Sequence, residues 1–224
     1  MDAIAYGQQA IRFNRELRVG EVYFFKYVGF EPTDMPSTFP LAIPTEYYVI
    51  MHARTEIHHA GANVSIPTLP SRFMDFIDTY RLRNRMLTDI IGIVVHVGPV
   101  RFSKSFERST PCRDVILMNI RGEFIVLRIW DKHVARHMTK WRLAEQGMWT
   151  LAATLLEKDN MQGALKTTQE TQIVFEPDNW RAIELAAYRL TLGPSRGSIL
   201  CRVRTLERRR EKMGLYANLR LGRL

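Results

Sequence analysis

The sequence predicts a mainly β protein, and three observations support this fold class. Aromatic and β-branched residues are concentrated in two segments near the N-terminus, 21–30 and 46–57. The segment 88–102 is rich in isoleucine and valine and is broken at Gly98-Pro99. Further segments of strand composition follow over 113–119, 123–130, 148–156 and 164–175. Short strands separated by turn residues indicate a barrel or sandwich rather than a helical protein.

The strands between residues 88 and 175 follow one order. Three strands come first, then a polar helix over 132–145, then two more strands. Ile120-Arg121-Gly122 lies between the second and third strands and predicts a hairpin. This is the Greek-key order of the five-stranded OB-fold. We therefore expect an OB-fold over 88–190, ending in a helix over 180–190 that Asp178 or Asn179 caps.

The N-terminal block predicts only part of such a barrel. Residues 8–17 have helical spacing, and the strands over 21–30 and 46–57 flank a loop with four prolines. A strand pair needs more apolar cover than one short helix provides, so we expect either exposed apolar surface in this block or packing against the short helix predicted over 71–80. The predicted domains are a partial OB-fold over 1–59, a linker with a short helix over 60–87, the OB-fold over 88–190 and a basic tail over 191–224.

Most of the net charge of +9 lies in the last 30 residues. Residues 195–224 contain nine Lys/Arg and two Asp/Glu, whereas the rest of the chain is nearly neutral, with 23 basic and 21 acidic residues. Ile199, Val203, Leu206 and Met213 have helical spacing in this tail. A nuclear-import signal, an arm for nucleic acid, a helix that docks on a partner and a poorly ordered extension all remain open.

Several classes of protein are excluded by what the sequence lacks. Two cysteines that form no CxxC pair argue against a disulfide framework and a cysteine zinc site, and they fit a reducing compartment. The first residues lack a long apolar core, so we expect no signal peptide, and the longest apolar run, 148–156 apart from Thr150, is far shorter than the roughly 20 residues of a membrane helix. His133 and His137 have zinc-ligand spacing but no third ligand, which favours a solvated helix face. With no phosphate-binding loop or nucleophile motif, we expect neither an enzyme nor a cofactor.

Alternation along 123–130 separates two faces of the predicted third strand. Residues 125, 127 and 129 are isoleucine or leucine and point into a core, whereas Val126, Arg128 and Trp130 point the other way. A tryptophan beside an arginine suits a base that stacks on the indole while the guanidinium contacts phosphate. The alternative is that Trp130 covers the end of the barrel.

Three motifs occur in order along this block: TDIIGIVVHVGP, RDVILMNIRGEFIVLRIWDKHV and LKTTQETQIVFEPD. Their order and spacing over about 88–190 resemble the second DNA-binding OB domain of the large subunit of replication protein A, in the divergent form found in plants. Upstream, AIAYGQQAIRFNRELRVGEVYFF and YYVIMHARTEI resemble the C-terminal half of the first DNA-binding domain of that subunit. The first two strands of that domain would precede Met1.

The resemblance implies stacking residues at three positions. Trp130 matches the stacking tryptophan of the second domain. Tyr6 falls where the first domain has a stacking aromatic residue in its third strand. Phe39, in the loop between the fourth and fifth strands, matches the other stacking residue.

The resemblance also implies phosphate contacts. Arg113 stands at the basic position that opens the second strand, in addition to Arg128, which the strand alternation places beside Trp130. Lys104 and Arg108 lie in the loop that joins strands one and two, which clamps ligands in OB-folds.

Three positions depart from the family pattern. Asn160 replaces the second stacking aromatic residue, Asp131 replaces the glycine after the tryptophan, and Asn119 replaces the aspartate before the hairpin. Loss of one stacking residue costs about 1–3 kcal/mol, so we expect weakened binding. The zinc ribbon and trimer interface of the family are not carried over, because the basic tail stands in their place.

Two functions are weighed on this sequence. The first is a nuclear, sequence-tolerant protein that binds single-stranded DNA in replication, repair or recombination. The same stacking and phosphate contacts could also bind RNA. For this function we expect neither a membrane nor zinc as a partner. The second is a protein-interaction module, derived from an OB-fold that has lost most DNA binding and contacts partners through its tail or strand edges.

Overall fold

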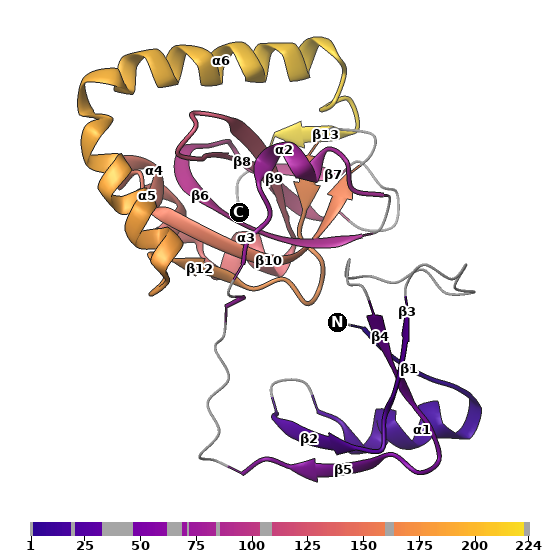
Figure 1. Ribbon diagram of the computed structural model, residues 1–224. Helices are drawn as coiled ribbons and strands as arrows, with labels where there is room; N and C mark the ends of the chain where they lie inside the picture. Colours follow the sequence, from indigo (N-terminus) through magenta and orange to yellow (C-terminus); the bar gives the residue numbers. More distant parts are fainter. Residues whose placement is uncertain are drawn as a thin grey trace. The chain divides into compact units, whose positions relative to one another are not determined.

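The chain divides into two compact units, Met1–Thr68 (unit 1) and Leu69–Leu224 (unit 2) (Figure 1). Unit 2 thus includes the second part of the linker predicted over 60–87 and the tail predicted over 191–224. The computed structural model describes residues 2–18, 21–32, 47–61, 69–70, 72–83, 86–103, 109–159 and 164–221.

Five strands of unit 2 close into a barrel. β6 pairs antiparallel with both β8 and β10, and β8 pairs antiparallel with β9. β9 runs parallel to β11, which pairs antiparallel with β10 and completes the ring. The five strands are β6 (Leu87–Val97), β8 (Pro111–Met118), β9 (Phe124–Trp130), β10 (Thr150–Asp159) and β11 (Ala164–Lys166). The closed five-stranded barrel confirms the predicted OB-fold.

The other elements of unit 2 extend or cover this barrel. β7 continues the line of β6 along β8, and β12 pairs with β10. Two short helices join β9 to β10, where the sequence predicts one helix over 132–145. The elements are α2 (Phe76–Thr79), β7 (Arg101–Ser103), α3 (Lys132–Arg136), α4 (Met138–Gly147), β12 (Ile173–Phe175), α5 (Trp180–Thr191), a 3-10 turn (Gly193–Ser195), α6 (Arg196–Lys212) and β13 (Leu219–Leu221).

The barrel interior is filled by alternate residues of its strands. Ile125, Leu127 and Ile129 of β9 are buried there, as their spacing predicts, and Trp141 of α4 joins the same cluster. Phe76 of α2 also enters this core, and a Cβ on Gly92 would lie only 2.8 Å from its ring. The predicted linker helix is thus short and contributes one core residue to the barrel.

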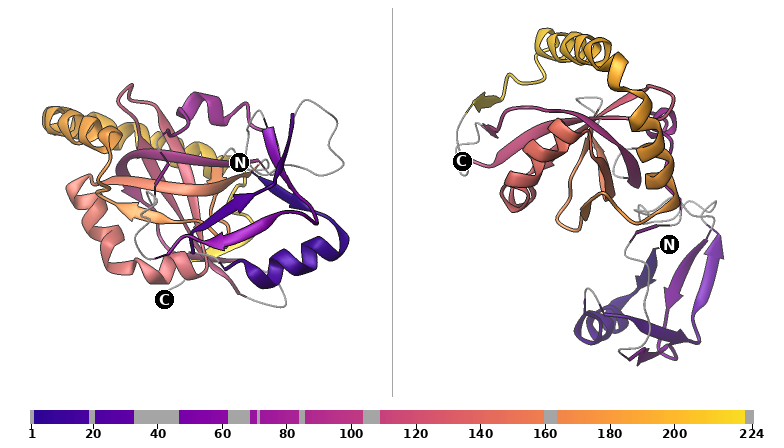
Figure 2. Two further views of the ribbon diagram at one scale, coloured as in Figure 1. Left: turned by 60° about the horizontal axis from the view of Figure 1, so that its bottom comes forward. Right: turned by 90° about the vertical axis from the view of Figure 1, so that its left-hand side faces the viewer.

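The outer face of the barrel is also apolar over part of its area. Ile116 and Val126 pack there in one cluster with Leu185 of α5 and with Ile199 and Val203 of α6. Figure 2 shows α5 and α6 lying along the same side of the barrel.

The helical tail is built from local signals in the sequence. The Asn179 side chain accepts a hydrogen bond from the backbone N–H of Arg181 at 2.9 Å and caps α5, as expected. The apolar spacing in the tail belongs to α6, which is docked on the barrel rather than disordered. Within the described part of the chain, no helix is both long and apolar enough to cross a membrane.

The described part of unit 1 has one short strand before its helix and four short strands after it. β1 runs parallel to β4, β3 pairs antiparallel with β4, and β2 pairs antiparallel with β5. In unit 2, too, the strand before the helices runs parallel to a later strand, β9 to β11. The elements are β1 (Ala3–Ala5), α1 (Gly7–Glu16), β2 (Tyr23–Lys26), β3 (Gly29–Pro32), β4 (Tyr47–Met51) and β5 (Glu56–His59).

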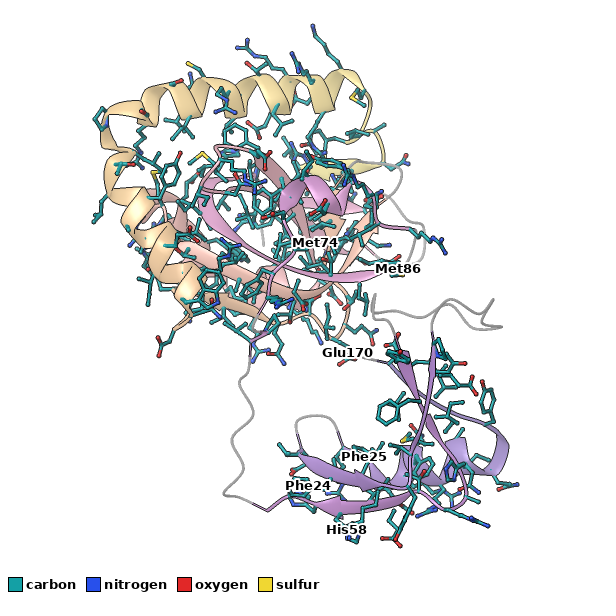
Figure 3. The ribbon with its side chains drawn as sticks, viewed as in Figure 1. Phe24, Phe25, His58, Met74, Met86 and Glu170 are labelled. Carbon is teal, nitrogen blue, oxygen red and sulfur yellow. The ribbon has the colours of Figure 1, made fainter. Side chains whose placement is uncertain are left out.

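The core of unit 1 is small. Phe13 of α1 packs as a buried residue, but Phe24 and Phe30 remain 55% and 60% exposed. Figure 3 shows Phe24 and Phe25 on β2, with His58 on the neighbouring strand β5. The exposed apolar surface expected for residues 1–59 is present.

Candidate functional site

The register of β8 and β9 places side chains in rows on the outer face of the barrel. Ile116 lies opposite Val126, Asp114 lies opposite Arg128, and Cys112 lies opposite Trp130. Directly opposed residues share a face of the sheet. Since Val126 and Ile116 belong to the outer cluster, all three pairs face outward.

The last row of this face combines an aromatic and a basic side chain. Arg101 of β7 lies opposite Cys112, so Arg101 and Trp130 flank Cys112 on one face. Trp130 is half-buried, and its backbone N–H donates to Thr167 Oγ1 at 2.9 Å. Neighbouring strands are about 4.8 Å apart, which places Arg101 and Trp130 roughly 10 Å from each other. We call Arg101, Cys112 and Trp130 the rim row.

The middle row is a buried ion cluster. Arg128 Nε donates to Asp114 Oδ1 at 2.7 Å and Arg128 Nη2 donates to Asp114 Oδ2 at 3.0 Å. Arg210 of α6 adds a third contact, from its Nη2 to Asp114 Oδ2 at 3.3 Å. Burial by itself raises the pKa of Asp114, but Arg128 and Arg210 hold that pKa below its usual value. The carboxylate is therefore charged and shared between two guanidinium groups.

The position of Arg128 corrects one expectation from the sequence. Arg128 is 1% exposed, and its Nε and Nη2 both donate to Asp114. Its pKa is raised because the Asp114 contacts outweigh the effect of burial. Arg128 thus stabilises the outer face and does not present its guanidinium to a phosphate.

Arg113 does not join Trp130 either. Arg113 lies opposite Ile129, whose side chain is in the barrel interior, so Arg113 is on the other face of β8. Its Nε is buried and has no hydrogen-bond partner among the described residues. Burial lowers its pKa, and the negative charge of Glu145 partly offsets this.

The remaining predicted residues lie either in unit 1 or outside the described residues. Tyr6 lies in unit 1, where it is 49% exposed and directly precedes α1. Phe39, Lys104 and Arg108 lie outside the described residues, as does Asn160.

The two other departures from the family pattern have clear local roles. Asn119 Oδ1 accepts hydrogen bonds from the backbone N–H groups of Arg121 and Glu123, at 3.0 and 2.9 Å, and shapes the hairpin turn as an aspartate would. Asp131 has φ +50° and ψ −122°, a backbone conformation that favours glycine. The glycine of the family motif would fit this position without strain.

The sequence patterns did not indicate Arg101 or Tyr216. The centre of the Tyr216 ring lies 3.8 Å from Cζ of Arg101, in the geometry of a cation–π contact. Arg101 could have been found from its position two residues after the Gly98-Pro99 break, at the entrance to the loop between strands one and two. No local pattern marks Tyr216.

The histidine pair has structural contacts instead of a metal-site arrangement. His133 Nε2 lies 3.1 Å from the Thr168 carbonyl oxygen, and His137 packs edge-on against Trp141 and Phe175. Burial lowers the pKa of both histidines. Across the described ranges, no group of three or more His, Cys, Asp and Glu residues could hold a metal ion.

Comparison with known proteins supports the fold. A family model described as a domain of unknown function (DUF8448) matches residues 74–166, and no curated protein is significantly similar. The solved structure of a replication protein A heterotrimer bound to ssDNA matches with a TM-score of 0.53 and 18% identity, over 86% of this chain and 44% of that chain. A murine DNA-binding protein bound with ds DNA has a TM-score of 0.31 and 6% identity, over 77% of this chain and 78% of that one, and is too distant to inform the fold.

The match to replication protein A establishes similarity of fold at this level of identity. This chain spans less than half the length of the replication protein A chain that it matches. Unit 2 of this chain contains the OB-fold barrel.

Proposed function

We propose that this protein binds single-stranded nucleic acid at the rim row of its OB barrel, with bases stacked on Trp130. The observation that carries the proposal is the position of Trp130 on the outer face of the third barrel strand, in one row with Arg101. OB-folds bind oligonucleotides on the face of their second and third strands and on the adjoining loops. In this chain those strands are β8 and β9.

The chemistry of the rim row suits a ligand of any sequence. Every base has a π-face that can stack on an indole, so stacking needs no base-specific hydrogen bond. Arg101 and Lys166 add positive charge on the outer face, Lys166 lying beside Arg128 in the register of β11 and β9. The Lys166 side chain is 35% exposed and lies 3.3 Å from Glu157, so part of its charge is already paired.

The finer assignment is to DNA metabolism. The order of the sequence motifs and the similarity to a replication protein A structure support a nuclear role with single-stranded DNA in replication, repair or recombination. The loop residues Lys104 and Arg108 remain proposed phosphate contacts, and Tyr6 and Phe39 remain proposed stacking residues in unit 1.

The test is a titration of labelled oligo-dT, followed by fluorescence anisotropy at low and moderate salt. We expect Trp130→Ala to weaken binding by about 1–3 kcal/mol, since stacking contributes that much per base. Trp180→Ala is the matched control, because Trp180 is 57% exposed on α5, away from the rim row. Equal affinities for the wild-type protein and Trp130→Ala would reject Trp130 as a stacking residue.

A protein-interaction module remains the second candidate. One observation favours it: Trp180, Ile183 and Leu190 form an exposed apolar stripe along α5. A folded wild-type protein that fails to bind oligo-dT at low salt would favour this second function.

A further inference from the structure

The end of α6 turns the chain back toward the barrel. The backbone N–H of Gly214 donates to Glu211 O at 2.9 Å, and that of Leu215 donates to Arg210 O at 3.1 Å. These two bonds, with φ +71° at Gly214, form a Schellman motif. The following residues, 215–221, are called the C-terminal segment here.

The C-terminal segment adds a strand to the barrel edge at β7. β13 pairs antiparallel with β7, Leu219 opposite Ser103, Arg220 opposite Phe102 and Leu221 opposite Arg101. Figure 1 shows β13 beside β7, above the barrel and below the end of α6. The segment therefore lies at the start of the loop that joins the first and second barrel strands.

Tyr216 covers the charged part of the outer face. Its ring centre lies 3.8 Å from Cζ of Arg101, 5.8 Å from Cζ of Arg128 and 5.9 Å from Cζ of Arg210. Arg210 Nε donates to the Tyr216 hydroxyl at 3.4 Å. A planar aromatic ring on an arginine guanidinium has the geometry by which proteins stack unpaired bases.

We propose that Arg101 is a nucleobase-binding site and that Tyr216 occupies it, so that the C-terminal segment competes with single-stranded nucleic acid for the face of β8 and β9. The inference rests on the proposed function, because it concerns the regulation of the same site. When the C-terminal segment is docked, Trp130 is half-buried at the rim and Tyr216 covers Arg101. When the segment is undocked, the site extends to Arg101.

The structure also indicates why the segment can leave while α6 stays. α6 is anchored on the barrel by Ile199 and Val203, which are 5% and 1% exposed. β13 is only three residues long, and Leu221 at its end is 71% exposed. Short edge strands with few apolar contacts open at low free-energy cost.

The experiment uses two glycine-to-alanine variants of the full chain. A Cβ would meet nothing within 4 Å at either Gly214 or Gly197, but only Gly214 has a positive φ. Gly214→Ala should weaken docking of the segment roughly 5- to 30-fold, because L-residues disfavour the left-handed conformation. Gly197→Ala, inside α6, is the control that should leave docking unchanged. A chain ending at Gly214 removes the segment and keeps the Arg210–Asp114 contact.

Binding of labelled oligo-dT distinguishes the outcomes. We expect several-fold tighter binding for Gly214→Ala, for Tyr216→Ala and for the chain ending at Gly214, with no change for Gly197→Ala. Adding Arg101→Ala to the shortened chain should remove the gain. Equal or weaker binding by the shortened chain would overturn the competition while leaving the proposed function in place. If the folded wild-type and shortened chains both fail to bind, the proposed function itself fails.

Discussion

The outer face of the barrel is covered in two different ways. Over one part, Leu185 of α5 and Val203 of α6 pack on apolar residues such as Val126. Over the other part, Arg210 and the C-terminal segment lie on the pair of Asp114 and Arg128. One contact is apolar and the other depends on ionised groups.

This difference indicates different roles for the two contacts. Apolar burial is non-directional and depends little on salt or pH. A buried ion cluster is costly to desolvate and depends on every partner staying in place. The apolar part therefore holds the helices on the barrel. The charged part specifies where the C-terminal segment docks and makes that docking dependent on the ionisation of Asp114.

The largest expected effect comes from breaking the charged contact. Asp114→Ala leaves Arg128 buried without its carboxylate, which costs about 3–5 kcal/mol for a buried pair. Asp178→Ala is the control, since Asp178 is exposed. Urea unfolding of both variants measures the effect. If Asp114→Ala lowers the free energy of unfolding no more than the control does, the ion cluster contributes nothing to stability.

The apolar contact is tested on α5. Leu185→Ala should lower the free energy of unfolding by about 2–5 kcal/mol, as for other buried leucines. Leu190→Ala on the same helix is the control, because Leu190 is 83% exposed. The Leu185→Ala loss should stay constant as the pH falls. The Asp114→Ala loss should shrink in acid, because the lowered pKa of Asp114 gives a stabilisation that is present above its unfolded pKa and is lost as the pH falls through the folded value. A similar pH dependence of both losses would erase the distinction between the two contacts.

A smaller effect is expected next to the rim row. Asp131→Gly should raise the free energy of unfolding by about 1 kcal/mol, because glycine adopts the positive φ of this position without strain. Asp131→Ala removes the same charge but keeps a Cβ, so it should give no such gain. Denaturant unfolding of the two variants separates backbone strain from charge. Tighter oligo-dT binding by both would show that the charge opposes binding.

The smallest effect concerns pH. His96 of β6 lies between Glu145 and Glu207, with Nδ1–Oε1 and Nε2–Oε1 distances of 2.8 and 3.0 Å. The hydrogen bond to Glu207 is the main cause of its raised pKa, which Glu145 also raises and burial opposes. A raised folded-state pKa gives a stabilisation that is complete below the unfolded value of about 6.5 and is lost as pH rises through the folded value.

The stability of the wild-type protein relative to His96→Gln should therefore fall as the pH rises through the raised pKa of His96. Unfolding measured from about pH 6 to about pH 9 checks this. Glu207 has a lowered pKa because of His96, so its contribution is present above its unfolded pKa and is lost in acid. A parallel pH profile for both proteins would contradict the role of His96 as a charged link between β6 and α6.

Much of the fold follows from local patterns. Alternation in 125–129 predicts which residues of β9 enter the core, and the turn at Ile120-Arg121-Gly122 predicts its hairpin. The Asn179 cap predicts the start of α5. These signals succeed because strand alternation, turns and caps depend on neighbouring residues.

The site was less predictable, because both faces of β8 are covered. The run Val115 to Met118 is continuously apolar, so the alternation that would have placed Arg113 on the inner face is hidden. In β9, the spacing placed Trp130 and Arg128 on the outer face, but it contained no information about the partner of Arg128.

The sequence alone thus determined the strand order, the barrel and the outward face of Trp130. The tertiary structure alone determined that Arg128 is buried in an ion pair with Asp114 and that the Tyr216 ring lies on Arg101. Asp114 and Arg210 are 96 positions apart in the chain. Contacts at this separation depend on how whole elements pack, and no local pattern of charge or hydrophobicity specifies which surface the end of a chain will cover.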